Sequence, residues 1–450
     1  MYNFIGHSAL LILSKLPYIL GSLLFAYFLA PDDYGKYVLY LTVINYLSIF
    51  CGLNFNQAYG RYLYEDVNLL PSNNFGSHIL IITLVSFLSF GFIGLSILIN
   101  YFSINLDFKI GFILLVISFA SLVDSLLNQY CIKFNTLKAG LIYFFVRNFL
   151  LFFLVFFLVI KGLDLKYIFL IESIVSILGI FYVIYFLNFQ FNFENFRTTL
   201  KYSFSYALPL LPYTFVLVIL SQFDRLVINS FFGNKITGTY SFNYNFGIIL
   251  SFLFSAIMNF NNNEFYDLCT NSSFSSFKNH QRSILFKFLF ISLFFVLVIL
   301  IFSNIIYPSQ KLSEVRFLPL VISAILFFSI WQIWVRILGF YKLTKIIGLI
   351  SIIVGMVYVV VLYSLFKFHF EYWYAYLASL LAYILMSVIG LYFVYKLSSE
   401  FVKPYIYDFF WYFLFLIISI VSVHYFYGSI LGFILLLGLV IIFKRKYLVI

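Results

Sequence analysis

The sequence predicts an all-α polytopic membrane protein with about fourteen transmembrane helices. Hydrophobic residues make up 64% of the 450 residues, charged residues only 10%, and the mean hydropathy is +1.05. A water-soluble domain carries roughly a quarter of its residues as charged ones, so the composition excludes a soluble globule. Apolar runs of about 20 residues, the length of a membrane-spanning helix, recur along the whole chain. The weaker alternating pattern of an outer-membrane barrel is not present in the sequence.

The pauses between apolar runs set the ends of the predicted helices. These helices lie near residues 8–30, 37–60, 77–100, 110–133, 141–160, 167–188, 204–232, 236–262, 283–307, 317–341, 345–366, 372–396, 405–427 and 429–443. The last two could form one re-entrant pair. The first run has no basic region ahead of it and no small-residue cleavage site, so we expect a span and not a removed signal peptide.

An even number of spans puts both termini on the same side of the membrane. If that side is the cytoplasm, the inner loops and the basic tail at Lys444–Lys446 hold more Lys and Arg than the outer loops, in line with the positive-inside rule. The net charge of +11 then reflects loops that lie near anionic lipid. The lysines are scattered and form no patch suited to nucleic acid.

Loop lengths and cysteines argue against an enzyme. The longest polar interruptions, near 61–76 and 263–282, are too short for a catalytic domain, and the outer loops have only a few residues each. The three cysteines, Cys51, Cys131 and Cys269, are far apart and lack the spacing of a metal site. We therefore expect inert thiols, no metal and no other cofactor.

Two outer turns of the chain resemble each other. When "LAPDDYGKY" (Leu29–Tyr37) is laid on "FGNKITGTY" (Phe232–Tyr240), Gly35 aligns with Gly238 and Tyr37 with Tyr240. An even number of helices separates the two turns, so the repeat is parallel. It predicts four segments: a six-helix lobe at 1–190, an amphipathic cytoplasmic linker at 191–203, a second six-helix lobe at 204–400 and an extra helix pair at 401–450.

Charged residues inside the helices mark candidate sites, because each costs about 2.5 to 3.5 kcal/mol near the middle of a span. Ordered by predicted depth, they form an inner layer of Lys15, Asp124 and Arg147 and an outer layer of Glu172, Asp224 and Arg225. A polar stripe accompanies the inner layer on one helix face: Ser121, Asp124, Ser125 and Asn128. Arg147 is predicted to pair with Asp124, and this pair either serves the substrate or only holds two helices together.

The outer layer raises a pairing problem. Asp224 and Arg225 point about 100° apart on their helix, so each needs another partner. Glu172 is the predicted partner of Arg225, in a bridge between the lobes. Arg336, near the inner end of its helix, either faces a cavity or extends to the lipid headgroups.

The run "SFSYALPLLPYTFVLVILSQFDRLVINSFFGNKITGTYSFNYNFG" (Ser203–Gly247) resembles the start of the second lobe in Wzx-type polysaccharide flippases. In that family a Pro-containing helix entry, an Asp-Arg pair, a Gly-bearing turn and a G-x-Y helix start follow in this order. "FLAPDDYGKYVLY" (Phe28–Tyr40) resembles the matching turn of the first lobe. These flippases belong to the multidrug/oligosaccharidyl-lipid/polysaccharide exporter superfamily, whose two helical bundles surround a central cavity.

The resemblance implies a multi-pass protein of the bacterial inner membrane. Its substrate would be an oligosaccharide repeat unit on undecaprenyl pyrophosphate, flipped for O-antigen (lipopolysaccharide) or capsule assembly. The resemblance also implies association with the O-antigen polymerase and the chain-length regulator. The two helices after the twelfth exceed the commonest family count, and they could lie against the lipid tail of the substrate.

A carrier of that substrate needs cations at the diphosphate. The candidate substrate-binding residues are therefore the basic ones inside helices: Lys15, Arg147, Arg225 and Arg336. The candidates for ion pairing or gating are the acidic ones: Asp124, Glu172 and Asp224. Two alternatives stay open, a drug/cation antiporter of the same superfamily, which a net acidic cavity would favour, and an O-antigen polymerase, which would need a large outer loop.

Overall fold

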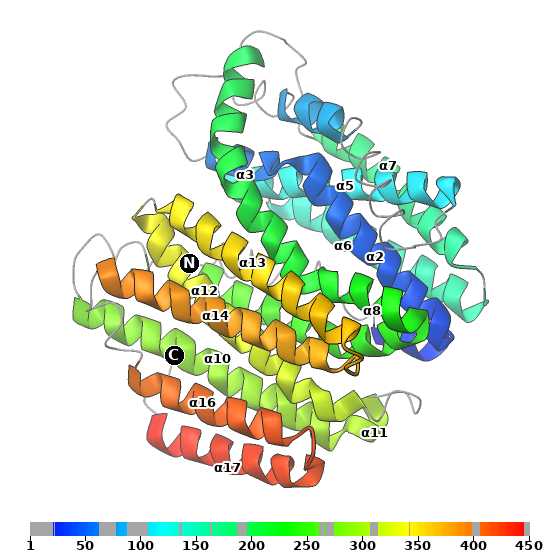
Figure 1. Ribbon diagram of the computed structural model, residues 1–450. Helices are drawn as coiled ribbons and strands as arrows, with labels where there is room; N and C mark the ends of the chain where they lie inside the picture. Colours follow the sequence, from blue (N-terminus) through cyan, green and yellow to red (C-terminus); the bar gives the residue numbers. More distant parts are fainter. Residues whose placement is uncertain are drawn as a thin grey trace. The chain divides into compact units, whose positions relative to one another are not determined.

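A computed structural model gives the fold of the chain (Figure 1). The structure describes residues 21, 23–62, 78–87, 107–134, 137–162, 164–186, 196–260, 265, 274–306, 314–341, 343–397 and 406–444. The chain divides into two compact units, Met1–Gly238 and Thr239–Ile450. The lobe boundaries that the sequence predicts, with a linker at 191–203, remain a prediction.

The described part of the chain is helical throughout. The first unit contains α2 (Pro31–Gly52), α3 (Phe55–Tyr62), a helix at His78–Phe87, α5 (Phe108–Phe134), α6 (Leu137–Ile160), α7 (Leu165–Phe186) and the part of α8 (Phe196–Phe260) that ends at Gly238. The second unit contains the rest of α8, then α10 (Phe274–Ile301), α11 (Ser303–Ile306), α12 (Leu318–Phe340), α13 (Thr344–Lys367), α14 (Tyr374–Leu397), α16 (Ile406–Val421) and α17 (Phe426–Lys444).

These helices confirm an all-helical membrane protein. Among the residues that the structure describes, seven helices are long and apolar enough to cross a membrane. The bounds predicted for α5, α6, α7, α12, α13 and α14 agree with the observed ones to within a few residues. Most of the predicted first helix, near 8–30 and with Lys15 in it, lies outside the described residues.

The single helix predicted at 37–60 is two helices in the structure, and both its start and its end differ from the observed ones. α2 already begins at Pro31, where a proline at the first helical position and the acidic Asp32 and Asp33 favour a helix start. It ends at Gly52, because Leu53 and Asn54 both have positive φ angles, 41° and 63°. The short α3 then begins at Phe55 and packs on α5.

α8 joins two predicted helices through one break. Gly233 has φ 79° and ψ 177°, a conformation open to glycine, and it separates the predicted helices at 204–232 and 236–262. Residues 196–203 of the predicted linker form the first turns of α8. Thr199 and Ser203 in these turns are buried, and Thr199 Oγ1 lies 3.0 Å from His78 Nδ1.

The two outer turns that match in sequence meet in space within the first unit. A Cβ atom on Gly35 would lie 1.9 Å from the backbone oxygen of Asn234. A Cβ atom on Gly238 would lie 2.9 Å from the backbone nitrogen of Gly35. Only glycine fits at this backbone contact, which is how small residues allow membrane helices to approach closely.

α12 is the central helix of the second unit, where it contacts α10, α13, α14 and α16. Figure 1 shows α16 and α17 side by side, and both pack against α10. Two hydrogen bonds fix this helix pair: Tyr412 Oη donates to the Leu285 carbonyl over 2.7 Å, and the hydroxyl oxygens of Ser323 and Ser419 are 2.8 Å apart. The pair is therefore an integral part of this unit.

We expect Gly35→Ala to lower the amount of folded protein in the membrane and the melting temperature in detergent. The added methyl group would overlap the Asn234 carbonyl, and overpacking of this kind costs about 1 to 3 kcal/mol or more. Gly339→Ala is the matched control, since its Cβ would meet nothing within 4 Å. Equal melting temperatures for the Gly35 variant and the wild type would refute the requirement for a glycine contact.

Candidate functional site

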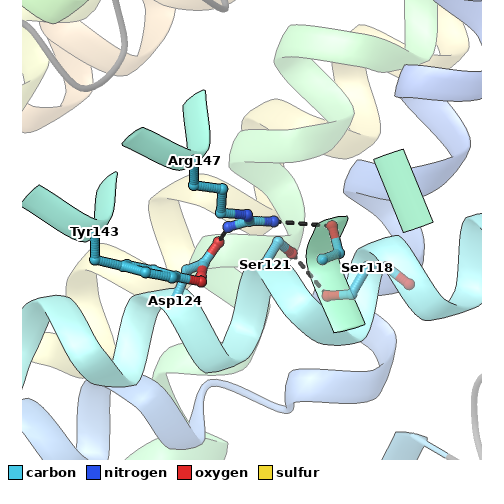
Figure 2. A network of polar contacts seen from close by, with 6 residues as sticks. Ser118, Ser121, Asp124, Tyr143 and Arg147 are labelled. Atoms are coloured by element: carbon cyan, nitrogen blue, oxygen red, sulfur yellow. Dashed lines mark hydrogen bonds and ion pairs between the residues drawn. The ribbon is translucent and has the colours of Figure 1, made fainter. Parts of the chain in front are cut away.

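Asp124 and Arg147 form the predicted ion pair in the first unit. Arg147 Nη1 on α6 donates to Asp124 Oδ2 on α5, and Arg147 Nη2 donates to Ser176 Oγ on α7 over 2.9 Å. Tyr143 Oη donates to the other oxygen, Asp124 Oδ1, over 3.1 Å. Figure 2 shows Tyr143 and Arg147 both reaching toward Asp124. The network thus holds three helices together through one partly buried charge pair.

The sequence spacing explains how this network forms. Tyr143 and Arg147 are four residues apart on α6, so their side chains share one face. Gly179 on α7 makes room for them, because a Cβ there would lie 2.3 Å from the Tyr143 hydroxyl oxygen. The Tyr143 ring also stacks on Tyr182, with ring centroids 4.9 Å apart. The surface of α7 at Gly179 and Tyr182 therefore fits the side chain of Tyr143.

Glu172 lies beside this network and not beside Arg225. It interacts electrostatically with Arg147 and is one helical turn from Ser176 on α7. The predicted bridge between Glu172 and Arg225 is not among the ion pairs of the described residues, in which the electrostatic partner of Glu172 is Arg147. The first unit therefore places two carboxylates, Asp124 and Glu172, around one guanidinium group.

One other residue of the predicted polar stripe, Ser125, serves a contact between helices. Ser125 accepts a hydrogen bond from Asn56 Nδ2 on α3 over 2.8 Å, which ties the short helix to α5. Ser121 donates to the Ser118 carbonyl over 2.7 Å and is exposed. The side chain of Asn128 lies outside the described part of the chain.

A second polar cluster, the α2–α8 seam, comprises Thr42 and Tyr46 of α2 with Gln222, Asp224 and Arg225 of α8. Gln222 Oε1 accepts two hydrogen bonds, from Arg225 Nη1 over 2.7 Å and from Thr42 Oγ1 over 3.1 Å. Asp224 Oδ1 accepts from the backbone N–H of Arg225 over 2.8 Å. Asp224 is 0% and Arg225 3% exposed, so the seam is closed in this conformation.

The site residues predicted from the sequence were all charged, so three uncharged members of the seam were not predicted: Thr42, Tyr46 and Gln222. Gln222 precedes Arg225 by three residues, so both lie on one face of α8. Thr42 and Tyr46 are four residues apart on α2 and share a face in the same way. Polar residues spaced three or four apart inside apolar helices are the sequence pattern that would have predicted these three residues.

Arg336 is bound within the second unit. Its Nη2 donates over 2.7 Å to the carbonyl of Met258 in the last turn of α8, and its guanidinium lies 4.8 Å from the Phe265 ring centroid. A cation at a helix C-terminus satisfies carbonyls that have no intrahelical partner. The contacts differ from both predicted roles, a side chain facing a cavity and one extended to the headgroups.

Glu314 is a buried carboxylate that the sequence reasoning missed. Tyr372, in the loop between α13 and α14, donates to its Oε1, and the Glu314 backbone oxygen accepts from Asn243 Nδ2 over 2.8 Å. Burial and the Glu314 carboxylate raise the pKa of the Tyr372 phenol. The short segment before α12 is thereby fixed to α8 and to the start of α14.

Metal binding has no support in the part of the chain that the structure describes, since it contains no group of three His, Cys, Asp or Glu side chains suited to an ion.

Residues 2–259 match the protein family described as "Polysaccharide biosynthesis protein". The chain belongs to this family. The match covers both outer turns and the Asp224-Arg225 pair, and it confirms the predicted relation to Wzx-type proteins. A search of curated protein sequences gives no match.

Several solved membrane proteins share the fold of this chain. The lipid II flippase MurJ in an inward closed conformation has a TM-score of 0.65 at 17% identity, over 99% of this chain and 100% of MurJ. An inward-facing multidrug resistance MATE transporter of the MOP superfamily has 0.63 at 12%, over 86% and 95%. A point mutant of the Vibrio cholerae MATE transporter VcmN has 0.62 at 11%, over 90% and 98%. The fold is that of a multi-pass membrane protein.

We expect Asp124→Ala and Arg147→Ala each to lower the amount of folded transporter strongly, because breaking a buried pair costs about 3 to 5 kcal/mol. The double Ala variant should lose less than the sum of the two. A charge swap should recover less than the neutral double variant, because an acidic residue at position 147 would face Glu172. Melting temperatures in detergent give the comparison, with Asp32→Ala, in an exposed pair with Lys36, as the control. Additive losses would contradict the coupling.

Proposed function

We propose that the protein flips undecaprenyl-pyrophosphate-linked oligosaccharide repeat units across the bacterial inner membrane, for O-antigen or capsular polysaccharide assembly. The observation that carries the proposal is membership in the polysaccharide biosynthesis family, over residues 2–259. A fold shared along nearly the whole chain with a protein named as a lipid II flippase supports a lipid-linked substrate. The O-antigen polymerase and the chain-length regulator are the proposed partners.

The buried cations supply the chemistry that the diphosphate needs. Arg147 is held by Asp124 and Ser176, and its Nε is buried without a hydrogen-bond partner. Arg225 is held by the neutral Gln222. Arg147 and Arg225 are the proposed contacts of the diphosphate, at the inner and the outer half of the path. Lys15 stays a candidate, whereas the bonds of Arg336 to Met258 favour a structural role.

The likeness to multidrug transporters supports a second candidate, a drug/cation antiporter with the same fold. A carrier of cationic drugs needs acidic groups that are not compensated by bases. In the two polar clusters of the first unit, Asp124 is paired with Arg147 and Asp224 lies beside Arg225. Glu172 also lies near Arg147, so the two clusters hold three carboxylates and two guanidinium groups. Family membership, and not charge balance, is therefore what favours the flippase.

We expect export in cells without another flippase to depend on Arg225. Arg225→Ala should abolish surface polysaccharide at normal protein levels, with intermediates accumulating in the inner leaflet, while Arg225→Lys keeps part of the export because it keeps the charge. Labelled surface polysaccharide and extracted lipid intermediates give the measurement. Unchanged surface polysaccharide on deletion of the protein, together with lost ethidium efflux, would support the antiporter instead.

Topology tests the proposed orientation with both termini in the cytoplasm. A reporter active only in the cytoplasm should respond after Ile450 and near Ser275, and one active only in the periplasm should respond near Asp33 and Asn234. The reason is the excess of Lys and Arg in the inner loops and the tail. The opposite pattern would refute the orientation and the assignment of Arg225 to the outer half.

A further inference from the structure

We propose that the α2–α8 seam binds the diphosphate of the lipid-linked substrate, with Tyr46 and Gln222 as hydrogen-bond donors beside Arg225. This inference rests on the proposed function and deepens it, since it adds binding residues and assigns one chemical part of the substrate to them.

The Tyr46 hydroxyl is the first observation behind this inference. Tyr46 is only 4% exposed, and its hydroxyl oxygen has no hydrogen-bond partner in the structure. It interacts electrostatically with both Asp224 and Arg225, so it belongs to the seam. An unpaired buried hydroxyl costs about 1 to 3 kcal/mol, which a phenylalanine would avoid. The hydroxyl is therefore a donor suited to a ligand between the two helices.

The orientation of Gln222 provides a second donor. A guanidinium group has no acceptor, so the Gln222 atom that contacts Arg225 must be the amide oxygen. The single hydroxyl hydrogen of Thr42 is shared between this oxygen, over 3.1 Å, and the Val38 carbonyl, over 3.0 Å, so the bond from Arg225 is the one that orients the amide. The amide nitrogen of Gln222 then forms the other end of the group and can only donate.

The donors of the seam select an oxyanion. The guanidinium, the amide nitrogen and the Tyr46 hydroxyl all donate, and one oxygen of the sole carboxylate, Asp224, already accepts from the Arg225 backbone. Phosphate oxygens accept such hydrogen bonds, and bonds to a charged acceptor are roughly twice as strong as neutral ones. The hydrocarbon of the substrate offers no acceptor, and sugar hydroxyls do not need a cation. The diphosphate is thus the part that fits.

The residues of the seam also determine how the diphosphate would be released and how it would reach the site. The Asp224 carboxylate balances the Arg225 charge, which limits how tightly an anion is held. Thr42, Tyr46, Gln222 and Arg225 are at most 8% exposed, so α2 and α8 must separate before the diphosphate enters.

Tyr46→Phe is the deciding variant, because it removes no hydrogen bond of the structure. The full chain in lipid nanodiscs should bind undecaprenyl pyrophosphate about tenfold more weakly after this change, the usual value of a hydrogen bond to a charged group. Its melting temperature should equal or exceed that of the wild type, and its Kd for undecaprenol, which lacks the diphosphate, should not change. Gln222→Leu should weaken binding of the diphosphate lipid at least as much, with a loss of stability as well.

Two matched variants serve as controls. Tyr40→Phe changes a buried tyrosine of the same helix that packs on Phe169, and Gln281→Leu changes a fully buried glutamine of the second unit. Both should bind like the wild type. Wild-type affinity for undecaprenyl pyrophosphate in Tyr46→Phe, or an equal loss in Tyr40→Phe, would overturn the inference and leave the proposed function standing. A wild type that binds undecaprenol as tightly as undecaprenyl pyrophosphate would overturn both.

Discussion

Compensation of buried charge by other protein groups is the constraint on which the rest of this structure depends. Lipid offers no hydrogen bonds, so each guanidinium inside the helices must find its partners within the bundle. Arg147 uses a carboxylate and a hydroxyl, Arg225 uses an amide oxygen, and Arg336 uses a backbone carbonyl. The bonds of Arg147 to Asp124 and Ser176 link α5, α6 and α7. Gln222, which accepts from Arg225, links α8 to α2 through Thr42. The bond of Arg336 to Met258 links α12 to α8.

The kind of partner decides how easily a guanidinium can exchange it. Arg147 contacts one carboxylate directly and feels a second, Glu172, so removal of this partner leaves charges unpaired in lipid. Arg225 instead bonds to a neutral amide, which a phosphate oxygen can replace with less electrostatic loss. The two clusters of the first unit therefore differ in chemistry: under the proposed transport cycle, an anion would displace a partner at a larger electrostatic cost in the Asp124 network than in the α2–α8 seam.

The sequence predicts well what depends on local pattern. Apolar run length sets the bounds of α5, α12 and α14, and adjacent helices with opposite charges at one depth predict the Asp124–Arg147 pair. Prediction from the sequence fails where contacts between helices determine the backbone or the side-chain partners. The break at Leu53–Asn54 has no proline and uses positive φ at two residues that are not glycine, and the Glu172 contact depends on which face of α7 meets α6. Gln222 carries no charge, so only its spacing of three residues from Arg225 marks it in the sequence.

The repeated outer turns show how one short motif can serve two packing needs. Its glycines, Gly35 and Gly238, lie in backbone contact with each other's turn, so each copy supplies half of one contact and neither could hold a larger residue alone. Its tyrosines behave differently. Tyr37 is buried against Phe169 in the first unit, and Tyr240 stacks on Tyr376 in the second, with ring centroids 4.4 Å apart. The two glycines thus bring two turns of the first unit together. The tyrosine two residues later packs in the first unit at position 37 and in the second unit at position 240.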